Sequence, residues 1–445
     1  MKNKLIAALM LLFCCCAPMY AAQKSIIGHW EGVMVREGAE LPVSFDFTSD
    51  AKGLKGSFDS RTWRVIGIPL RKVSYTTPKA HFELAGDATT TVFDGELNGD
   101  TLTGQFQENK AQGTFSLRRI EAKPLPYKQE EVHFQNKDVT LSGTLLIPIT
   151  TERRPAVVFL HGAGGEGRFG ARFLADHLAR HGIAALIYDK RGVGASTGDW
   201  KRSDFNDLAD DALAGIHFLQ QRKEINPKQI GIYGHSQGGM IGPLIASRSK
   251  DVAFVVSGAG SAVPVYESEI NSITNQVRAQ GISGKELAEA TEFIKMWVNV
   301  MRTGQGWEEF DRAVEKVRET KWFPMLHVPP KDHWMWTFHK RIYDYNSADY
   351  WEKVGVPVLL IYGERDMYVP LAPTIANIDR ALRKARNSDY SIVMLPRASH
   401  AFIIEPEANQ PFELWHVAPG FPDLVLAWIN QRVGGIRPRP TKPCS

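Results

Sequence analysis

A short stretch near the middle of the chain has the residue types and spacing of a nucleophile at a sharp turn. The pattern G-x-S-x-G occurs as Gly234-His235-Ser236-Gln237-Gly238, between an apolar run that ends at Tyr233 and apolar residues at helical spacing. A strand that turns so tightly into a helix exposes a serine hydroxyl above the sheet edge, and its glycines avoid Cβ clashes. The pattern predicts that Ser236 is a nucleophile; the alternative is a purely structural glycine-rich turn.

A serine hydroxyl is a poor nucleophile at neutral pH and needs a base at the same edge of the sheet. Among the histidines, His400 follows a predicted strand at residues 391–395 directly. His416 is the second choice, because no predicted strand precedes it. We therefore expect His400 to be the general base for Ser236.

The carboxylate that orients the base should follow the preceding strand. Asp366 lies in the loop after the predicted strand 358–362, and Glu364 in the same loop is the alternative, with a surface ion pair to Arg365 as its structural explanation. The chain order Ser236, Asp366, His400 at three strand ends predicts a Ser-His-Asp triad.

Acyl transfer also needs two N–H donors for the oxyanion that forms on the substrate. The amide of Gln237, at the start of the predicted helix, is expected to supply one. The run His161-Gly162-Ala163-Gly164-Gly165 follows a predicted strand at residues 155–160, so we expect Ala163 to supply the other. We interpret His161 as structural, bonded to the backbone near the turn.

Alternating strands and helices between residues 131 and 432 predict a parallel sheet covered on both faces, opened by an antiparallel pair near residues 132–147. Residues 262–351 interrupt this alternation with helical, aromatic-rich sequence. An insertion there should form a cap over the active-site edge. Its tryptophans are interpreted mainly as helix packing, with one or two as candidates for a substrate pocket; they are Trp297, Trp307, Trp322, Trp334 and Trp336.

Residues 130–432 resemble the α/β-hydrolase superfamily, and in particular bacterial serine hydrolases grouped with S9 and S33 aminopeptidases and related carboxylesterases. Besides the Ser, Asp and His pattern, the segment from Asp189 to Gly198 is similar to the D-x-R-G-x-G-x-S segment of that group. We interpret this segment as structural and do not assign a catalytic role to Arg191. The resemblance implies hydrolysis through an acyl-enzyme, without a cofactor or a metal.

Two classes of substrate follow from this resemblance. The favoured function is a secreted serine hydrolase that cleaves small-molecule carboxylic esters, and the alternative is an aminopeptidase or dipeptidyl-peptidase-like serine peptidase of the same fold. The cap offers Glu267 and Glu269, which could pair with the ammonium group of a short peptide. A third reading is a binding protein with a silent hydrolase, and the intact Ser-Asp-His pattern argues against it.

Residues 23–122 have a different pattern, with short alternating strands and a hairpin turn at Asn98-Gly99. They predict a small all-β barrel or sandwich of roughly eight strands. Gly28-His29-Trp30 is similar to the G-x-W opening of lipocalin-like barrels. A proline-containing linker, residues 123–130, follows. Because this β module contains no catalytic cluster, we expect it to bind a ligand or shield the enzyme, and the chemistry to survive its removal.

The start of the chain has the charged, apolar and small-residue regions of a secretory signal peptide at residues 1–22. Export to the periplasm or beyond is therefore expected, without an integral membrane span after cleavage. Cys14 makes a lipid anchor the less favoured alternative, because Phe13 fits a lipobox poorly. The net charge of +4 over 445 residues argues against a nucleic-acid partner. Residues 433–445 are predicted to be a disordered tail.

Overall fold

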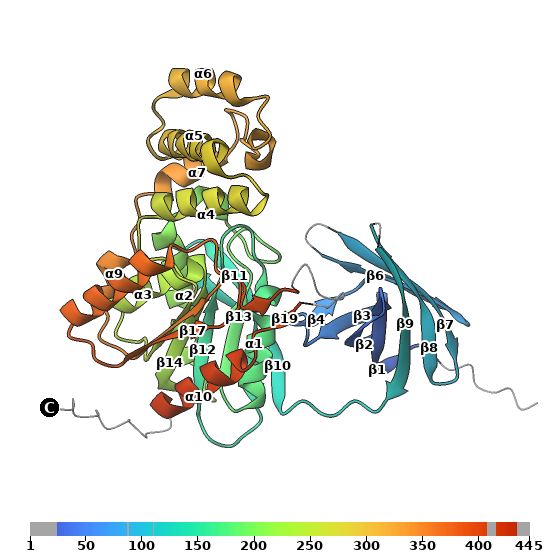
Figure 1. Cartoon of the computed structure of the whole chain (residues 1–445). Coiled ribbons are helices and arrows are strands. Elements are labelled where there is room, and N and C mark those ends of the chain that lie inside the picture. The colour runs from blue at the N-terminus through green and yellow to red at the C-terminus, as the bar shows by residue number, and fades with distance from the viewer. Residues whose placement is uncertain (1–24, 87–88, 110, 407–414, 434–445) are drawn as a thin grey trace, which may run out of the picture.

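The computed structural model describes residues 25–86, 89–109, 111–406 and 415–433 (Figure 1). The predicted signal peptide, with its possible lipidation site, and residues 434–445 of the predicted tail lie outside these ranges. Val433, the first residue of that predicted tail, is instead the last residue of a helix. Within the described ranges the chain builds two large sheets, a two-stranded ribbon, and a helical insertion above the second large sheet.

The β module is one nearly closed antiparallel sheet of nine strands, in the order β4-β3-β2-β1-β9-β8-β7-β6-β5. Alternation places Phe45, Phe47, Phe82, Phe93 and Phe115 on its inner face, where all five rings are almost fully buried. The strands are β1 Gly28–Arg36, β2 Ala39–Asp50, β3 Gly53–Ser60, β4 Val65–Pro69, β5 Arg71–Thr76, β6 Lys79–Ala85, β7 Thr90–Asn98, β8 Thr101–Glu108 and β9 Ala111–Ile120.

The second sheet has eight strands in the order β10-β11-β13-β12-β14-β15-β16-β17. The β10-β11 pair is antiparallel and the pairings from β13 onward are parallel, as the sequence pattern predicts. The antiparallel pairing of β11 with β13 was not predicted. β10 begins inside the segment expected to be a linker. The strands are β10 Tyr127–Asn136, β11 Val139–Pro148, β12 Arg154–Leu160, β13 Ala184–Tyr188, β14 Ile225–His235, β15 Val255–Gly258, β16 Val358–Gly363 and β17 Tyr390–Leu395.

Helices cover both faces of this sheet (Figure 1). Two of them, α1 Arg172–Arg180 and α10 Phe421–Val433, contact each other on one face. On the other face lie α2 Phe205–Gln220, α3 Gln237–Arg248 and α9 Leu371–Lys384. Two short turns of 3₁₀ helix lie in the connections: the four-residue η1 Arg168–Ala171 and the three-residue η2 Trp200–Arg202. The α/β-hydrolase fold class with a preceding all-β domain is thus confirmed.

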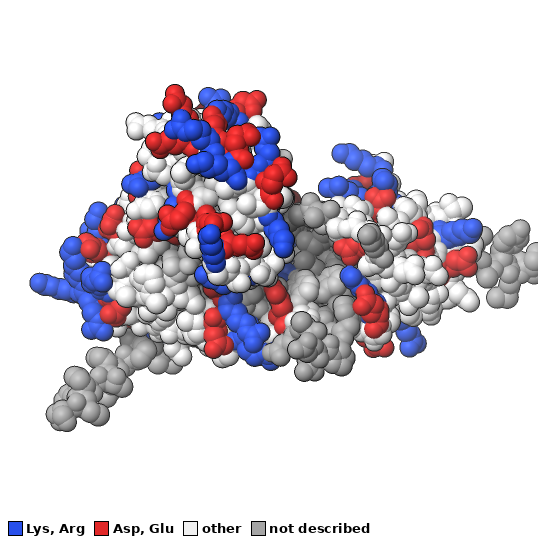
Figure 2. Space-filling model, turned by 45° about the horizontal axis from the view of Figure 1, so that its top comes forward, with Lys and Arg blue, Asp and Glu red and all other residues white. Residues whose placement is uncertain are grey.

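The cap is inserted between β15 and β16 and rises above the active-site edge of the sheet (Figure 1). Trp297, Trp322 and Trp336 are buried within it, which agrees with their interpretation as packing residues. Figure 2 shows basic and acidic side chains intermixed over the cap helices on the face in view. The elements are α4 Val265–Ala279, α5 Gly284–Thr303, α6 Trp307–Val317, η3 Phe323–Leu326, α7 Met335–Ile342 and α8 Ala348–Trp351.

Candidate active site

Ser236 lies at the apex of the turn from β14 into α3, in a strained backbone conformation with φ 55° and ψ −117°. Its amide donates to the carbonyl of Gly258 at 2.8 Å, which ties the turn to β15. A Cβ at Gly234 would lie 2.2 Å from the carbonyl oxygen of Gly238, and a Cβ at Gly238 would lie 2.9 Å from that of His161. Both glycines are therefore required by close backbone approach, as the motif predicts.

The structure brings together the three residues predicted to form a triad. His400 Nε2 lies 2.9 Å from Ser236 Oγ, and His400 Nδ1 lies 2.8 Å from Asp366 Oδ2. The other carboxylate oxygen of Asp366 accepts from the amides of Tyr368 at 2.8 Å and Val369 at 3.1 Å. Because Asp366 satisfies Nδ1–H, the lone pair of Nε2 faces the serine hydroxyl. This arrangement allows proton transfer from Ser236 to His400.

The two alternatives are placed elsewhere. Glu364 is exposed and accepts from the amide of Arg397 at 2.7 Å, so that its carboxylate holds the turn before His400. His416 lies in a two-stranded ribbon of β18 Ile403–Ile404 and β19 His416–Val417. Neither residue hydrogen-bonds to Ser236 or His400 in the described structure.

Gln237 and Ala163 lie beside Ser236 in the wall of one cavity. Gln237 is the first residue of α3, and the first amides of a helix have no partner within the helix. Ala163 is exposed in the loop after β12. The two predicted oxyanion donors thus lie in different segments, the start of α3 and the loop after β12, which both line the same cavity.

Lys190 supports the Ala163 loop, a role that the sequence analysis missed. Its ammonium group donates to the carbonyls of Gly162 at 2.5 Å and Gly164 at 2.6 Å, on either side of Ala163. The side chain is 1% exposed, and burial lowers its pKa to about 8. The sequence signal was a lysine two residues after a wholly apolar strand. A cation buried at that position must find oxygen acceptors nearby.

The interpretation of His161 as structural agrees with its contacts. Its Nε2 hydrogen-bonds to the carbonyl of Tyr188. Burial, and secondly the charge of Lys190, lower the pKa of His161 to about 3. The ring is therefore neutral at physiological pH and fixes the end of β12 to the end of β13.

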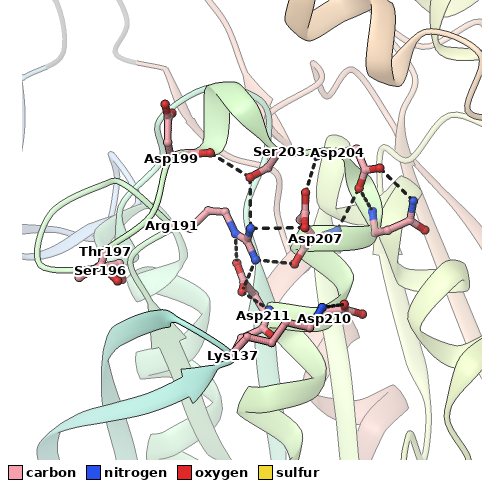
Figure 3. A network of polar contacts seen from close by, with 12 residues as sticks. Lys137, Arg191, Ser196, Thr197, Asp199, Ser203, Asp204, Asp207, Asp210 and Asp211 are labelled. Atoms are coloured by element: carbon pink, nitrogen blue, oxygen red, sulfur yellow. Dashed lines mark hydrogen bonds and ion pairs between the residues drawn. The ribbon is translucent and has the colours of Figure 1, made fainter.

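Arg191 belongs to a polar network that fixes the 189–198 segment to α2 (Figure 3). Its Nε and Nη2 donate to the two carboxylate oxygens of Asp211, each at 2.7 Å. Its guanidinium also donates to the Ser203 hydroxyl at 3.2 Å and the Asp207 carbonyl at 3.0 Å. These contacts agree with the structural role expected for this segment.

The cavity above Ser236 has a volume of about 290 Å³ and lies between the strand ends and the cap. Much of its wall is apolar, and no cap tryptophan contributes to the described lining. A larger hollow of about 530 Å³ opens beside β10 and α2, remote from the nucleophile. The residues that line the Ser236 cavity from the cap are Val265, Ser268, Glu269, Ser272, Gln276, Phe338, His339, Ile342 and Tyr343.

The two glutamates of α4 have different surroundings. Glu269 lines the cavity, and burial raises the pKa of its carboxyl group. It forms no ion pair with any described residue. Glu267 is exposed and accepts a hydrogen bond from the Tyr266 hydroxyl at 2.9 Å. Of the two candidates for binding an ammonium group, only Glu269 faces the site.

Across the described ranges, no group of three or more histidine, cysteine, aspartate or glutamate side chains is arranged to hold a metal ion. The same part of the chain contains no helix with both the length and the apolar character needed to cross a bilayer.

Comparisons with known proteins place this site in a wider group. The family model described as serine aminopeptidase, S33, matches residues 151–407. The chain is 26% identical over 298 residues to esterase EstD of Thermotoga maritima, which covers 63% of this chain and 64% of that protein. It is 31% identical over 145 residues to the quorum-quenching protein AidA of Acinetobacter baumannii, covering 32% of this chain and 45% of that protein. The chain thus spans less than two thirds of these relatives.

Among solved structures, the α/β hydrolase GrgF from Penicillium superposes with a TM-score of 0.45 at 19% identity, over 69% of this chain and 99% of that one.

Proposed function

The chain belongs to the serine aminopeptidase S33 family of α/β-hydrolases, and we propose that it is a serine hydrolase that cleaves carboxylic esters of small molecules. The observation that carries this proposal is the hydrogen-bonded series Ser236, His400, Asp366 at the floor of a largely apolar cavity. An apolar wall favours a neutral acyl or alcohol group over a charged one. The esterase name of the Thermotoga relative supports the same substrate class.

In the proposed reaction, Ser236 Oγ attacks the ester carbonyl carbon while His400 Nε2 accepts the hydroxyl proton. Asp366 stabilises the resulting imidazolium through Nδ1–H. The amides of Gln237 and Ala163 donate to the oxyanion of the tetrahedral intermediate. The C–O bond to the alcohol then breaks, and His400 returns the proton to the leaving oxygen. Water, deprotonated by His400, attacks the acyl-enzyme in the same way and releases the carboxylic acid.

A screen of p-nitrophenyl esters against aminoacyl p-nitroanilides with a free amine tests this assignment. We expect turnover of short acyl esters, little turnover of the anilides, and covalent labelling of Ser236 by a fluorophosphonate. Faster hydrolysis of the anilides than of the esters would show that the ester assignment is wrong.

The peptidase remains the second candidate because Glu269 faces the cavity without a cationic partner among the described residues. In a peptidase, Glu269→Gln should raise KM for free-amine substrates at least tenfold and leave small esters unaffected, since a charge-assisted contact is lost. Glu267→Gln is the matched control, because Glu267 is two residues away and exposed. It should change neither KM for free-amine substrates nor the hydrolysis of small esters.

The pH dependence gives a second measure of the same contact. An ammonium group binds the ionised carboxylate, and burial raises the pKa of Glu269. KM for free-amine substrates should therefore fall as pH rises through that pKa. The Glu269→Gln enzyme should lack this dependence, and neutral esters should not show it with either enzyme.

Export by the N-terminal signal peptide, to the periplasm or outside the cell, is likewise proposed from the sequence of residues 1–22 alone.

A further inference from the structure

The loop that carries His400 is fixed on its inner side by the hydrolase domain. The amide of Ser399 donates to the carbonyl of Ile403 at 2.8 Å, which closes a tight turn around His400. Phe402 is fully buried, and its ring lies 4.9 Å from that of Phe421. His235 Nε2 donates to the carbonyl of His400 itself at 2.8 Å. Burial lowers the pKa of His235 to about 3, so this contact comes from a neutral ring.

The outer side of the same loop is held by the β module. The connection between β3 and β4 projects toward the hydrolase domain (Figure 1), and the ring of Trp63 in that connection stacks on that of Trp415, just before β19, with the ring centroids 5.9 Å apart. Arg64, in that connection, donates through Nη1 to the carbonyl of Ala401, the residue after His400. Its guanidinium carbon also lies 5.8 Å from the ring centroid of Phe421. A residue of the β module therefore contacts the peptide next to the proposed base.

The surroundings of Arg64 indicate that this contact is specific. Arg64 has a positive φ of 56°, which is uncommon outside glycine and must be maintained by its contacts. The side chain lines a cavity of about 100 Å³ beneath the 161–168 loop, together with Tyr233 and His235. It forms no ion pair with a described carboxylate. A half-buried guanidinium without a counter-charge relies on carbonyl acceptors, and here the acceptor is Ala401.

A neighbouring arginine makes a domain contact that does not involve the His400 loop. Arg61 Nη2 forms an ion pair with Asp176 Oδ2 on α1 at 2.9 Å. Asp176 is fully buried and also accepts from Arg180 and from the Tyr127 hydroxyl, so Arg61 fixes the module to α1 and β10 rather than to the His400 loop. Substitution of Arg61 therefore tests docking of the module, whereas substitution of Arg64 also removes the contact with the His400 loop.

We propose that Arg64 is a positioning residue and that the β module completes the active site by fixing the backbone next to His400. The inference rests on the proposed function, in which His400 moves the proton of Ser236. It differs from the expectation that the chemistry survives removal of the module. A shift of about 1 Å in a reacting group can cost about 100-fold in rate. The loss of the Arg64 contact should therefore appear in kcat rather than in KM.

The test compares Arg64→Ala, Arg64→Lys and Arg61→Ala in the full chain. The measurements are kcat and KM on the best p-nitrophenyl ester, the rate of Ser236 labelling by a fluorophosphonate, and Tm. We expect Arg64→Ala to lower kcat and the labelling rate about tenfold or more with KM nearly unchanged. Arg64→Lys, which retains a charged donor, should recover most of both rates. Arg61→Ala should lower Tm and retain kcat.

Wild-type kcat and labelling in Arg64→Ala would overturn the proposal. So would an equal fractional loss of kcat in Arg61→Ala, because docking alone would then explain the effect, or a failure of Arg64→Lys to recover any rate at wild-type Tm. The labelling rate needs no substrate. If no ester is hydrolysed but labelling still depends on Arg64, the ester assignment fails and the positioning role stands.

Discussion

The strand ends and the cap contribute to the site in different ways. Ser236, Asp366 and His400 follow β14, β16 and β17, and backbone hydrogen bonds and close glycine contacts fix their loops. Among the described residues, the cap contributes side chains of α4, of α7 and of Tyr343 directly after α7, which line the cavity from above. Backbone-fixed groups are positioned to fractions of an ångström, whereas packed side chains can exchange with a neighbour of similar volume. Changes at the strand ends should therefore act on kcat, and changes in the cap on KM.

The largest effect is expected for Ser236→Ala. Removing the nucleophile should lower kcat/KM by about 10³-fold or more, because the serine and its base act as a unit. Circular dichroism should show an unchanged fold, since a single oxygen atom is removed. An enzyme that kept more than a tenth of the wild-type rate would contradict the assignment of Ser236.

His400→Ala and Asp366→Asn should come next, with His400→Ala at least as severe. The histidine moves a proton in every step, whereas the aspartate orients the ring and stabilises its charge. Loss of kcat by about 10³-fold or more is expected for both. Glu364→Gln is the matched control in the same loop, because the Glu364 carboxylate accepts from the amide of Arg397 and hydrogen-bonds to no triad residue in the described structure. If Asp366→Asn were active and Glu364→Gln inactive, the carboxylate of the triad would be Glu364 rather than Asp366.

Lys190→Met should have an intermediate effect. The substitution keeps an unbranched side chain that is one atom shorter and removes its N–H donors. The carbonyls of Gly162 and Gly164 then lose their partner, and Ala163 loses its fixed position. Loss of one oxyanion donor costs about 10²-fold to 10³-fold, and loosening it should cost about tenfold to 10²-fold in kcat. The exposed Lys137→Met is the control. A normal kcat in Lys190→Met would show that the 162–165 loop holds its shape without the lysine.

The smallest change in kcat is expected in the cap, where Phe338→Ala and Trp322→Ala form a pair. Phe338 lines the cavity, so its loss should raise KM for esters of matching size severalfold. Trp322 is 1% exposed and lies outside the cavity lining, so its loss should lower the free energy of unfolding by about 3 to 5 kcal/mol with little change in KM. Steady-state kinetics and denaturant unfolding separate the two. A large fall in kcat for either variant would contradict the expectation that the cap acts on KM and the strand ends act on kcat.

The sequence was most informative where the chemistry depends on local backbone geometry. Glycines and strand periodicity placed Ser236 at its turn, and strand order placed Asp366 before His400. Contacts between distant segments were not predicted, because no local pattern records them. Arg64 and Ala401 are 337 positions apart, and their contact is visible only once both domains are placed.

The roles of Glu267 and Glu269 could be predicted in part. Residues two apart on a helix point in different directions, so both could not have faced the same ligand. The sequence therefore allowed one of the two to be excluded, but the choice between them needed the orientation of α4. The β module has nine strands, against roughly eight predicted, and the break between β4 and β5 falls between two alternating runs that the sequence separates.

The base of the cap has a consequence for how this protein can diversify. The amide of Val265 donates to the carbonyl of Tyr345 at 3.0 Å, and the Ser347 hydroxyl donates to the carbonyl of Ser261 at 2.6 Å, so the two ends of the cap insertion lie side by side. Closing a loop between such fixed points costs entropy that grows only with the logarithm of its length, about 0.6 kcal/mol for each doubling. Recombination could therefore exchange the whole insertion for a longer or shorter one with little penalty to the sheet. New substrate preferences could then evolve on an unchanged catalytic floor.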